Sequence, residues 1–481
     1  VSLLHRFDYL STKKTDMRFV AVSSLCLFFV NTIQAQDFPG LRTSNYAGVT
    51  NVFFNPANIA DSRHRWDFTL FNISTSIGNN QASFKLQDIG RTLDADSIKN
   101  KIFSGNAGSS SGFASAVVQG PSVFFNLNKK SALAITSRAR VMTNIIDIDG
   151  KLAEQLVDEI NDNTGFPYRI SSTNNMVVNA NAWTEFGLSY AREIYTAGNH
   201  YLKGGITFKY LAGAANASVN IDNLNGTLGL DAPSNEAYLT NAKGRIGLNF
   251  GGINTDNFEA ADLLEFESSG LGADIGFVYE YRPGTNEMRR DLNKYKFKVG
   301  IALLDVGSVK YDRDVSRSGS YSINIGATQR FYLSALTDAG IDNFKDTLNK
   351  YPQFFAPDAN MPLASYNASL PTTLQLNVDY HFHKGLYVNL ATQLALTNSR
   401  TKASNSQYYS SIAITPRFEN KTIGVYIPLT YNSLTNITAG AAFRLGPLFI
   451  GSGSILSAAL GSSKQADIIF GLHFGSLQKS K

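Results

Sequence analysis

Asp379, His381 and His383 are the residues whose spacing most readily suggests reaction chemistry. A carboxylate and an imidazole two positions apart lie on one face of an extended strand, where they can exchange a proton or bind a metal ion. The spacing supplies neither a nucleophile nor a third ligand, and polar residues of an interior or a turn give the same pattern. The sequence contains no glycine-rich phosphate loop, and its single cysteine excludes a cysteine pair. We therefore predict that the protein is not an enzyme and needs no cofactor or metal ion.

The segments that position these residues alternate between apolar and polar side chains. Between residues 271 and 281 every odd position is apolar, whereas the even positions carry glycine, valine or an acidic side chain. The same alternation occurs at residues 133–141, 202–210, 297–303 and 374–382. Stretches of about ten alternating residues are typical of transmembrane β-strands. Short turn sequences join several of these stretches, so we expect consecutive hairpins.

The composition of the 481 residues limits the class of protein. Only 17% are charged and 12% are aromatic, which is unlike a typical soluble enzyme or a disordered chain. The longest apolar stretch, residues 25–30, is much shorter than the roughly 20 residues that a membrane-spanning helix needs. Together with the alternation, this predicts an all-β fold, a transmembrane antiparallel β-barrel of about 14 strands over residues 63–474. A secreted β-sandwich, whose strands also alternate, is the soluble alternative.

The connections between the alternating segments differ in length. Those at about residues 145–174 and 327–370 are long, and each includes a helix-like stretch, at residues 151–160 and 334–350. Because outer-membrane barrels have short turns at one end and long loops at the other, we expect these two connections to be outer loops. The last alternating segment ends on Phe474 and is followed by a tail, residues 475–481.

The amino-terminal residues have the features of an export signal. Met17 and Arg18 precede an apolar stretch of about a dozen residues, and small residues follow up to Ala35. We expect residues 1–35 to be removed, with residues 1–16 as an upstream extension or part of the basic region. The mature chain then has no cysteine, because the only one is Cys26. Export and the barrel pattern together predict the outer membrane of a Gram-negative bacterium, with its lipid as a partner.

Charged residues occupy the polar phase of many predicted strands, and in a barrel they share one lumen. Both signs occur in similar numbers, so these side chains can pair instead of creating the single-sign field of an ion-selective pore. For most of them, filling of the interior is the preferred interpretation. Since the formal net charge of the whole chain is only +5, no nucleic-acid partner is expected. The predicted lumen charges are Arg138, Arg140, Glu185, Lys203, Lys209, Asp274, Glu280, Lys296, Lys298, Asp379, Arg417 and Glu419.

Residues 48–58, Gly-Val-Thr-Asn-Val-Phe-Phe-Asn-Pro-Ala-Asn, resemble a known amino-terminal element. The match depends on Asn55, Pro56 and Ala57. The element is similar to that of FadL-type outer-membrane transporters of long-chain fatty acids and of the related PorV-type barrels. Further short motifs, at residues 41–48, 120–122, 303–307 and 370–372, resemble a Bacteroidota-type family of outer-membrane proteins with no assigned function. The sharp motifs cover some forty residues, and the overall pattern covers nearly the whole mature chain.

The resemblance implies a fourteen-stranded barrel in which residues 36–62 fold inside as a hatch. Local chemistry agrees, because an Asn-Pro pair directs Asn55 away from helix and Pro56 has no N–H to donate. An ordinary turn before the first strand is the alternative that local chemistry leaves open.

Gly120 and Pro121 interrupt an alternating stretch between residues 113 and 127. Proline cannot donate to a strand ladder, so it is confined to edges, bulges or strand starts. FadL-like barrels use a strand kink to open sideways into the membrane, and we hypothesise a comparable lateral gap here. The alternative is a strand that simply begins at Pro121.

Two functions follow from these observations. The first is passive transport of hydrophobic or amphipathic small molecules by a plugged, FadL-like barrel. The second is a PorV-like accessory role without transport, in which the outer loops bind a partner protein during secretion or envelope assembly. The sequence favours transport only because Asn55, Pro56 and Ala57 belong to the hatch element. The transported molecule, the partner and the oligomeric state are not determined by the sequence.

Overall fold

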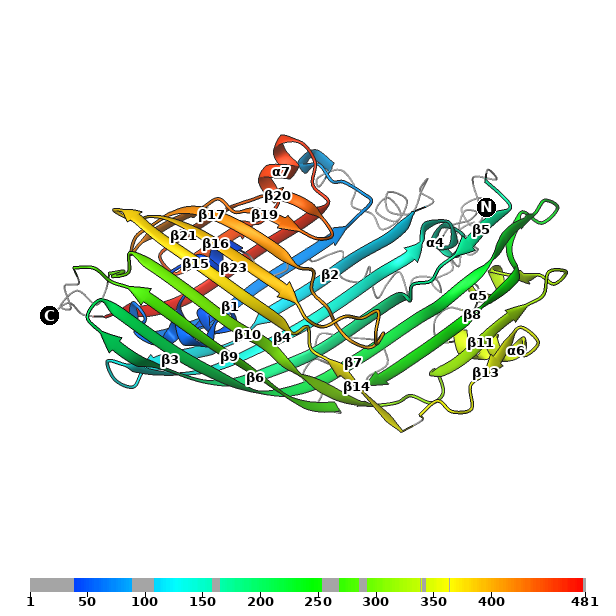
Figure 1. The fold of residues 1–481 in the computed structure, drawn as a ribbon, viewed down its shortest axis with the longest axis horizontal. Helices are drawn as coiled ribbons and strands as arrows, with labels where there is room; N and C mark the ends of the chain where they lie inside the picture. Colours follow the sequence, from blue (N-terminus) through cyan, green and yellow to red (C-terminus); the bar gives the residue numbers. More distant parts are fainter. Residues whose placement is uncertain are drawn as a thin grey trace, which may run out of the picture.

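The computed structural model is a closed antiparallel β-barrel, as the sequence predicted (Figure 1). It describes residues 39–88, 108–157, 165–252, 268–284, 292–337, 339, 343–362 and 364–478. The barrel closes where the first strand pairs with the last one, and four of its fourteen strands consist of two pieces. In order, the strands are β1 (His64–Asn79), β2 (Ser109–Gln119) with β3 (Ser122–Asn126), β4 (Ser131–Asp149), β6 (Met176–Ala197), β7 (His200–Asp231), β9 (Ser268–Tyr281), β10 (Phe297–Asp312), β14 (Ser365–Ser369) with β15 (Thr373–His383), β16 (Leu386–Ala395), β17 (Ser411–Glu419), β18 (Ile423–Tyr426) with β19 (Leu429–Asn432), β20 (Asn436–Ala439) with β21 (Ala441–Leu445), β22 (Leu448–Ser452) and β23 (Gln465–Leu477).

The outer wall of the barrel is apolar at every second position. On β9, Leu271, Ile275 and Phe277 are exposed, whereas Asp274 and Glu280 are buried inside. Closure satisfies the backbone groups of the ladder, and the outward Leu, Ile, Phe and Tyr side chains supply the surface that lipid requires. No helix in the described part of the chain is long and apolar enough to cross a membrane.

The two ends of the barrel differ. At one end, called the short-turn end, tight turns join β3 to β4, β6 to β7, β15 to β16 and β21 to β22 (Figure 1, left). Three of these turns contain residues with positive φ: Gly198 between β6 and β7, Lys384 and Gly385 between β15 and β16, and Gly446 between β21 and β22. The opposite, long-loop end carries the long connections predicted at residues 145–174 and 327–370, so the predicted asymmetry is confirmed for these two. One long connection, residues 282–296 between β9 and β10, lies at the short-turn end. In outer-membrane barrels the short turns face the periplasm.

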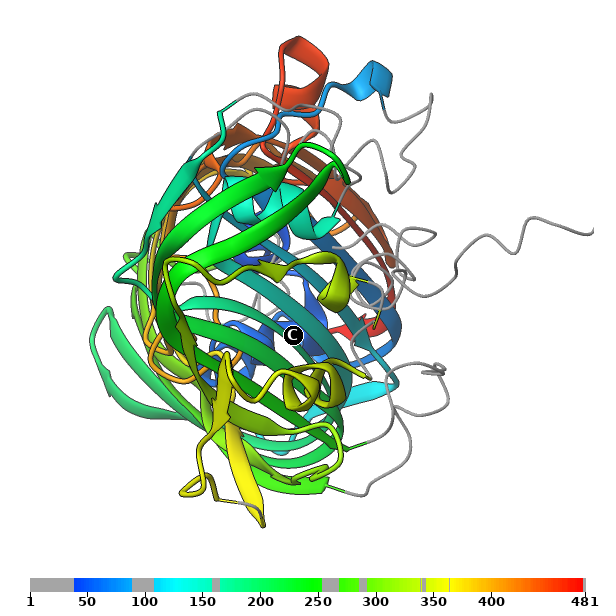
Figure 2. The same cartoon turned by 90° about the vertical axis from the view of Figure 1, so that its right-hand side faces the viewer.

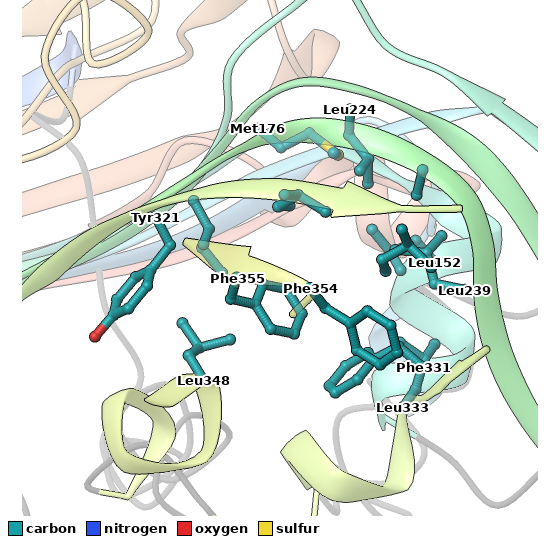
Figure 3. Packing of buried hydrophobic residues seen from close by; sticks show 14 of the residues in the cluster. Leu152, Met176, Leu224, Leu239, Tyr321, Phe331, Leu333, Leu348, Phe354 and Phe355 are labelled. Atoms are coloured by element: carbon teal, nitrogen blue, oxygen red, sulfur yellow. The ribbon is translucent and has the colours of Figure 1, made fainter. Parts of the chain in front are cut away.

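Beyond the long-loop end, the sheet continues outside the closed barrel, where β7 pairs with a strand that does not belong to the barrel. Residues 200–213 of β7 pair with β9 in the barrel, and residues 215–231 pair with β8 (Glu236–Gly252). This sheet and three helices enclose an apolar core in which the ring centroids of Phe331 and Phe355 are 4.8 Å apart (Figure 3). The other elements of this region are β5 (Tyr168–Ser171), β11 (Gly319–Ile325), β12 (Phe331–Tyr332), β13 (Phe355–Pro357), α4 (Gly150–Val157), α5 (Ser334–Thr337) and α6 (Phe344–Lys350).

The helical predictions hold in part. Helix α4 covers most of residues 151–160, of which residues 158–160 lie outside the described residues. The stretch 334–350 forms two helices, α5 and α6, and the barrel strand piece β14 lies within the predicted loop 327–370. On the opposite side of this end, α7 (Ile455–Leu460) contacts the short 3-10 helix η3 (Leu86–Asp88).

Residues 39–61 lie inside the barrel near the short-turn end, and we call this segment the hatch (Figures 1 and 2, dark blue). It consists of α2 (Pro39–Thr43), η1 (Gly48–Phe53) and η2 (Pro56–Ile59). Val49, Val52, Ala57 and Ile59 are fully buried. The hatch contacts β1, β3, β4, β6, β7, β9 and β17. An ordinary turn before β1 would have none of these contacts inside the barrel.

Candidate functional site

The Asn55-Pro56-Ala57 motif fastens the hatch to the barrel wall. Asn55 is the N-cap of η2, and its Oδ1 accepts a hydrogen bond from the Ala57 N–H at 2.9 Å. Its Nδ2 donates to the carbonyl oxygens of Phe277 on β9 and Ile301 on β10, both at 3.1 Å. Pro56 occupies the first helical position, where a missing N–H costs little. One side chain thus caps the hatch helix and links it to two strands.

The wall is recessed where this motif lies, because glycines face it. A Cβ at Gly276 would lie 2.2 Å from Asn55 Oδ1, and a Cβ at Gly205 would lie 2.5 Å from the Ala57 nitrogen. Contacts this short are not tolerated, so any larger residue at either position displaces the hatch or the strand. The glycines of β7 and β9 are therefore part of the binding surface for the hatch.

A second attachment point joins the hatch to the first and last strands of the barrel. The N–H of Val49 donates to Asp67 Oδ1 at 2.8 Å, and the other oxygen of Asp67 lies 2.7 Å from His473 Nδ1. Gly48 has a positive φ of 58°, and a Cβ there would overlap the Asp67 carboxylate. No sequence pattern indicates this contact, since Asp67 and His473 are far apart in the chain and meet only because β1 pairs with β23.

Ion pairs hold the end of the hatch. Asp61 Oδ2 lies 3.2 Å from Arg63 and 2.8 Å from Arg282, and Glu280 pairs with Arg282 and with Lys203 at 2.5 Å each. Burial by itself would raise the pKa of Asp61, but the guanidinium groups of Arg63 and Arg282 outweigh it and hold that pKa well below its ordinary value. The Asp61 side chain at the end of the hatch is therefore ionised, and its carboxylate pairs with the guanidinium groups of Arg63 and Arg282.

A further polar cluster contacts the start of the hatch. Glu419 accepts hydrogen bonds from Ser44 Oγ at 3.1 Å and Asn45 Nδ2 at 2.5 Å. Next to it, Arg417 donates both terminal nitrogens to Asp379 at 2.7 Å, in a bidentate pair with no exposed surface. Lys298 lies 3.9 Å from Asp379. Because Asp379 is fully engaged by Arg417, it does not form an acid–base pair with His381, which stacks on Tyr387 instead.

The remaining lumen charges meet between the hatch and the long-loop end. Arg138 and Arg140 bind the two oxygens of Glu185 at 2.9 and 2.8 Å, and Lys209 binds Asp274 at 2.7 Å. Asp305 connects these pairs, with Arg140 at 2.9 Å and Lys209 at 2.6 Å. Three cations therefore face three carboxylates, all buried, on β4, β6, β7, β9 and β10. Such a balanced cluster produces no net field along the lumen.

Asp305 was absent from the predicted charges because a bulge reverses its direction. The pairing of β10 with β9 shifts between Leu303 and Val306, and Asp305 has a φ of 57°. The motifs at residues 303–307 and 370–372 meet at this bulge. Thr372 Oγ1 donates to the Asp305 carbonyl at 2.7 Å, and the Leu370 N–H donates to the Gly307 carbonyl at 3.0 Å. Simple alternation would place Asp305 on the lipid side with Leu303.

Lys296 is the one predicted lumen charge that lies outside the lumen. Its ammonium donates to the Phe382 carbonyl at 3.1 Å and lies 4.7 Å from the ring centroid of Tyr380, whose side chain faces outward. The prediction extended the alternation of β10 back to Lys296, but β10 begins at Phe297. Alternation fixes the face of a side chain only within the strand itself.

Gly120 and Pro121 separate β2 from β3. Both pieces pair with the same neighbours, β1 and β4. Side chains bridge the break, since Ser137 Oγ donates to the Pro121 carbonyl at 3.0 Å and Ser122 Oγ accepts from the Ser137 N–H at 3.2 Å. The Gly120 N–H also donates to the Ser137 carbonyl at 3.0 Å. The break is therefore a kink in one strand, held by one backbone hydrogen bond and by the hydroxyl groups of Ser122 and Ser137.

The connection between β16 and β17 folds back into the barrel from the long-loop end, and we call residues 397–410 the inward loop. Three buried asparagines on neighbouring strands hold its backbone. Asn144 donates to the Gln407 carbonyl at 3.0 Å, Asn179 to those of Ala403 and Asn405 at 2.8 and 2.9 Å, and Asn216 to that of Ser404 at 3.0 Å. Tyr408 accepts a hydrogen bond from Arg140 at 2.6 Å, which links the inward loop to the charged cluster. No sequence motif indicated this loop.

Among the described residues, the hatch borders at least two small cavities. The first, of about 60 Å³, lies between the hatch and β9, β10 and β15, and is lined by Asn45, Asn55, Asn58, Lys298 and Asn377, among others. The second, of about 30 Å³, lies against β16, β17, β19 and β20, and is lined by Gln393, Thr430 and Asn432, among others. Both linings are mainly polar. Among the described residues no group of three His, Cys, Asp or Glu side chains is placed to hold a metal ion.

The protein is thus a plugged antiparallel β-barrel, whose lumen is obstructed by the hatch, the charged cluster and the inward loop. Over residues 56–453 the chain matches DUF5723, described as a family of unknown function, and it belongs to that family. No curated protein matches its sequence.

The chain is also similar, at low sequence identity, to solved structures of other proteins. A Pseudomonas aeruginosa FadL homologue is 11% identical with a TM-score of 0.41, over 88% of this chain and 93% of that one. The TodX monoaromatic hydrocarbon channel, as a deltaS2 mutant, is 9% identical with a TM-score of 0.40, over 90% and 95%. The translocator domain of the autotransporter NalP from Neisseria meningitidis is 7% identical with a TM-score of 0.28, over 85% and 89%.

Proposed function

We propose that the protein is a channel of the Gram-negative outer membrane that passes hydrophobic or amphipathic small molecules when its hatch moves. The observation that carries this proposal is the way the hatch is attached. It is bound to a recessed wall through side-chain contacts, chiefly those of Asn55, Asp67 and Asp61, and through buried apolar packing. Among the described residues, no backbone hydrogen bond joins it to the barrel strands. A segment held in this way can leave without breaking the barrel ladder.

The inward loop is the second barrier of the proposed channel. It closes the lumen from the long-loop end, while the hatch closes it from the short-turn end. Between them, the charged cluster joins five neighbouring strands and resists displacement, because removal of one partner of a buried ion pair leaves its counter-charge unpaired. The proposed path therefore runs along the opposite wall, past β1, β2 and β15–β23.

The kink at Gly120 and Pro121 is the proposed lateral exit. The hatch touches it, since Thr50 Oγ1 donates to Gln119 Oε1 at 3.0 Å. At this point hydroxyl hydrogen bonds from Ser122 and Ser137 replace part of the ladder. The strand pairing is interrupted here between Gln119 and Ser122, so a solute released from the hatch meets a break in the ladder.

The test is uptake of a labelled fatty acid by liposomes that contain the purified barrel. The wild type is compared with a deletion of residues 36–58 and with Asn55→Ala. We expect faster uptake for both variants than for the wild type, and Asn58→Ala serves as the matched control because Asn58 lines the same cavity without a side-chain hydrogen bond to the described residues. If no variant imports any solute, the transport proposal is wrong.

The second candidate function is that of an accessory barrel that binds a partner protein. The sheet formed by β7, β8 and β11 favours it, because this sheet has its own apolar core beyond the barrel (Figure 3). A channel alone does not need such a platform. Replacement of residues 215–252 by one short linker and of residues 319–357 by another removes the outer part of β7, β8 and β11–β13 but keeps the barrel strands β9 and β10. This variant should lose partner capture but keep uptake if the platform serves only binding.

A further inference from the structure

The cavity between the hatch and β9, β10 and β15 has more positive than negative groups in its lining. Its charged residues, among those that the structure describes, are the cations Arg42, Arg63, Lys203 and Lys298 and the acids Asp61 and Glu280. Next to the lining, the cations Arg282 and Arg417 are matched in number by the acids Asp379 and Glu419. The positive excess of the lining therefore remains, and a cavity with an excess of one sign attracts ions of the other.

Lys298 lies between two carboxylates that other cations have already engaged. On β10 it is opposite Glu280 of β9 and Asp379 of β15. Glu280 pairs with Lys203 at 2.5 Å, and Asp379 accepts hydrogen bonds from both terminal nitrogens of Arg417 at 2.7 Å. Neither carboxylate is therefore available to neutralise Lys298 alone.

The ammonium of Lys298 has few contacts of its own. Its nitrogen is 3.9 Å from the Asp379 carboxylate, and it donates one long hydrogen bond, of 3.4 Å, to Asn45 Oδ1. It also lies 4.9 Å from the ring centroid of Tyr295. Because a lysine ammonium has three N–H groups, the described residues leave most of its hydrogen-bonding capacity unused.

The cavity gives this ammonium room for a ligand. The Lys298 side chain is 15% exposed, and the cavity has a volume of about 60 Å³. Such a space holds roughly four to six water molecules, or one oxyanion of similar size. An oxyanion would accept charge-assisted hydrogen bonds from the ammonium, which are stronger than those between neutral groups.

The cavity also lies at the contact between the hatch and the barrel wall. Arg42, Asn45 and Asn55 line it from the hatch, and Lys203 and Lys298 line it from β7 and β10. A small anion bound there lies between the two surfaces, so it binds the docked hatch and not the displaced one. A ligand that binds only one state of a protein stabilises that state by mass action.

We propose that this cavity is a binding site for an oxyanion group, a phosphate or a carboxylate, with Lys298 as its charged contact. A free ion and the acidic end of an amphipathic solute share this chemistry. The free ion goes beyond the proposed function, because it needs no transport, whereas the acidic solute rests on it. The two sources have opposite effects on the hatch. A free ion stabilises docking, but the cavity has no room for an alkyl chain, so an acidic amphiphile must displace the hatch to bind.

The test is hydrogen exchange, measured by mass spectrometry on the full-length barrel in nanodiscs. Inorganic phosphate or octyl phosphate is added, with sodium chloride at equal ionic strength as the reference, and calorimetry gives the Kd of phosphate. We expect phosphate at ten times its Kd to slow the exchange of residues 48–60 about tenfold, since docking gains a factor of 1 + [L]/Kd. Faster exchange with octyl phosphate would assign the site to the acidic end of a solute. If neither compound acts beyond sodium chloride, the inference is wrong.

A lysine variant identifies the charged contact. Lys298→Met removes the charge and keeps the length of the side chain, so we expect it to weaken phosphate binding at least tenfold and to abolish the effect on hatch exchange. Lys296→Met is the matched control, because Lys296 lies two positions earlier and its ammonium is outside the lumen. Equal phosphate binding by the wild type and both variants would exclude Lys298 as the contact.

Two further readouts keep the outcome clear. Unchanged exchange of the β9 and β10 amides would show that the wall of Lys298→Met is intact, and if this variant does not fold, the wild-type titration still decides whether phosphate binds. Exchange and calorimetry require no solute to cross the barrel. Lys298-dependent phosphate binding without any uptake by liposomes would therefore refute transport and leave the oxyanion site in place.

Discussion

Replacement of Asn55 by alanine should loosen the hatch while leaving the barrel intact. The substitution removes the cap of η2 and both hydrogen bonds to the carbonyls of Phe277 and Ile301. A helix cap contributes about 1 kcal/mol, and an intramolecular hydrogen bond contributes about 0.5–1.5 kcal/mol net. The loss should therefore be about 2–4 kcal/mol, which corresponds to a roughly 30- to 700-fold increase in the open fraction of the hatch.

Hydrogen exchange measured by mass spectrometry in nanodiscs reports this opening directly. We expect amides of residues 48–60 to exchange faster in Asn55→Ala by about that factor, while the amides of β7 and β9 keep their protection. Asn58→Ala should exchange like the wild type. Equal exchange in Asn55→Ala and Asn58→Ala would show that the Asn55 contacts do not hold the hatch, and faster exchange of β9 as well would show that the substitution damages the wall.

Three further predictions concern the same barriers. Gly276→Ala should expel the hatch, because the new Cβ would lie 2.2 Å from Asn55 Oδ1, an overpacking cost of about 1–3 kcal/mol that hydrogen exchange of residues 48–60 would detect. Asn179→Asp should release the inward loop by replacing two donated hydrogen bonds with repulsion, a loss of about 2 kcal/mol that should appear as faster protease cleavage within residues 397–410. The third prediction is a pH dependence, because the pKa of Asp61 is lowered in the docked hatch. Its ion pairs stabilise docking fully above the ordinary aspartate pKa, near about 4, and this stabilisation is lost as the pH falls below that value. Hydrogen exchange of the hatch amides should therefore become faster in acid.

Each of these predictions has a control within the chain. Gly272→Ala places a Cβ on the same strand as Gly276 but 3.3 Å from the flexible end of Leu370, so the hatch should stay docked. Asn181→Asp alters the adjacent inward position of β6, whose amide has no hydrogen-bond partner among the described residues, and should not release the inward loop. Asp61→Asn should remove the acid sensitivity; an unchanged pH profile in that variant would exclude Asp61 as its source.

The sequence predicted the elements of the lumen better than their connections. Charged residues such as Arg138 and Glu185 could be assigned to the polar phase because their strands alternate without interruption. Their partners could not be assigned, since period two gives the face of a strand but not the neighbour across the lumen. The motif at residues 303–307 was recognised, yet its chemical consequence, the inward turn of Asp305, depends on a bulge stabilised by Thr372 from another strand.

What the sequence alone determined is the barrel and the presence of a special amino-terminal segment, because both depend on local patterns: alternation against lipid, and the conformational limits of Asn55 and Pro56. Only the tertiary structure decided where that segment binds, which charges pair and which loop enters the lumen. Asp67 meets His473, and Asn179 meets Ala403, only after the sheet has closed on itself. Closure joins residues hundreds of positions apart, and no local pattern records a contact that exists only when the first and last strands are paired.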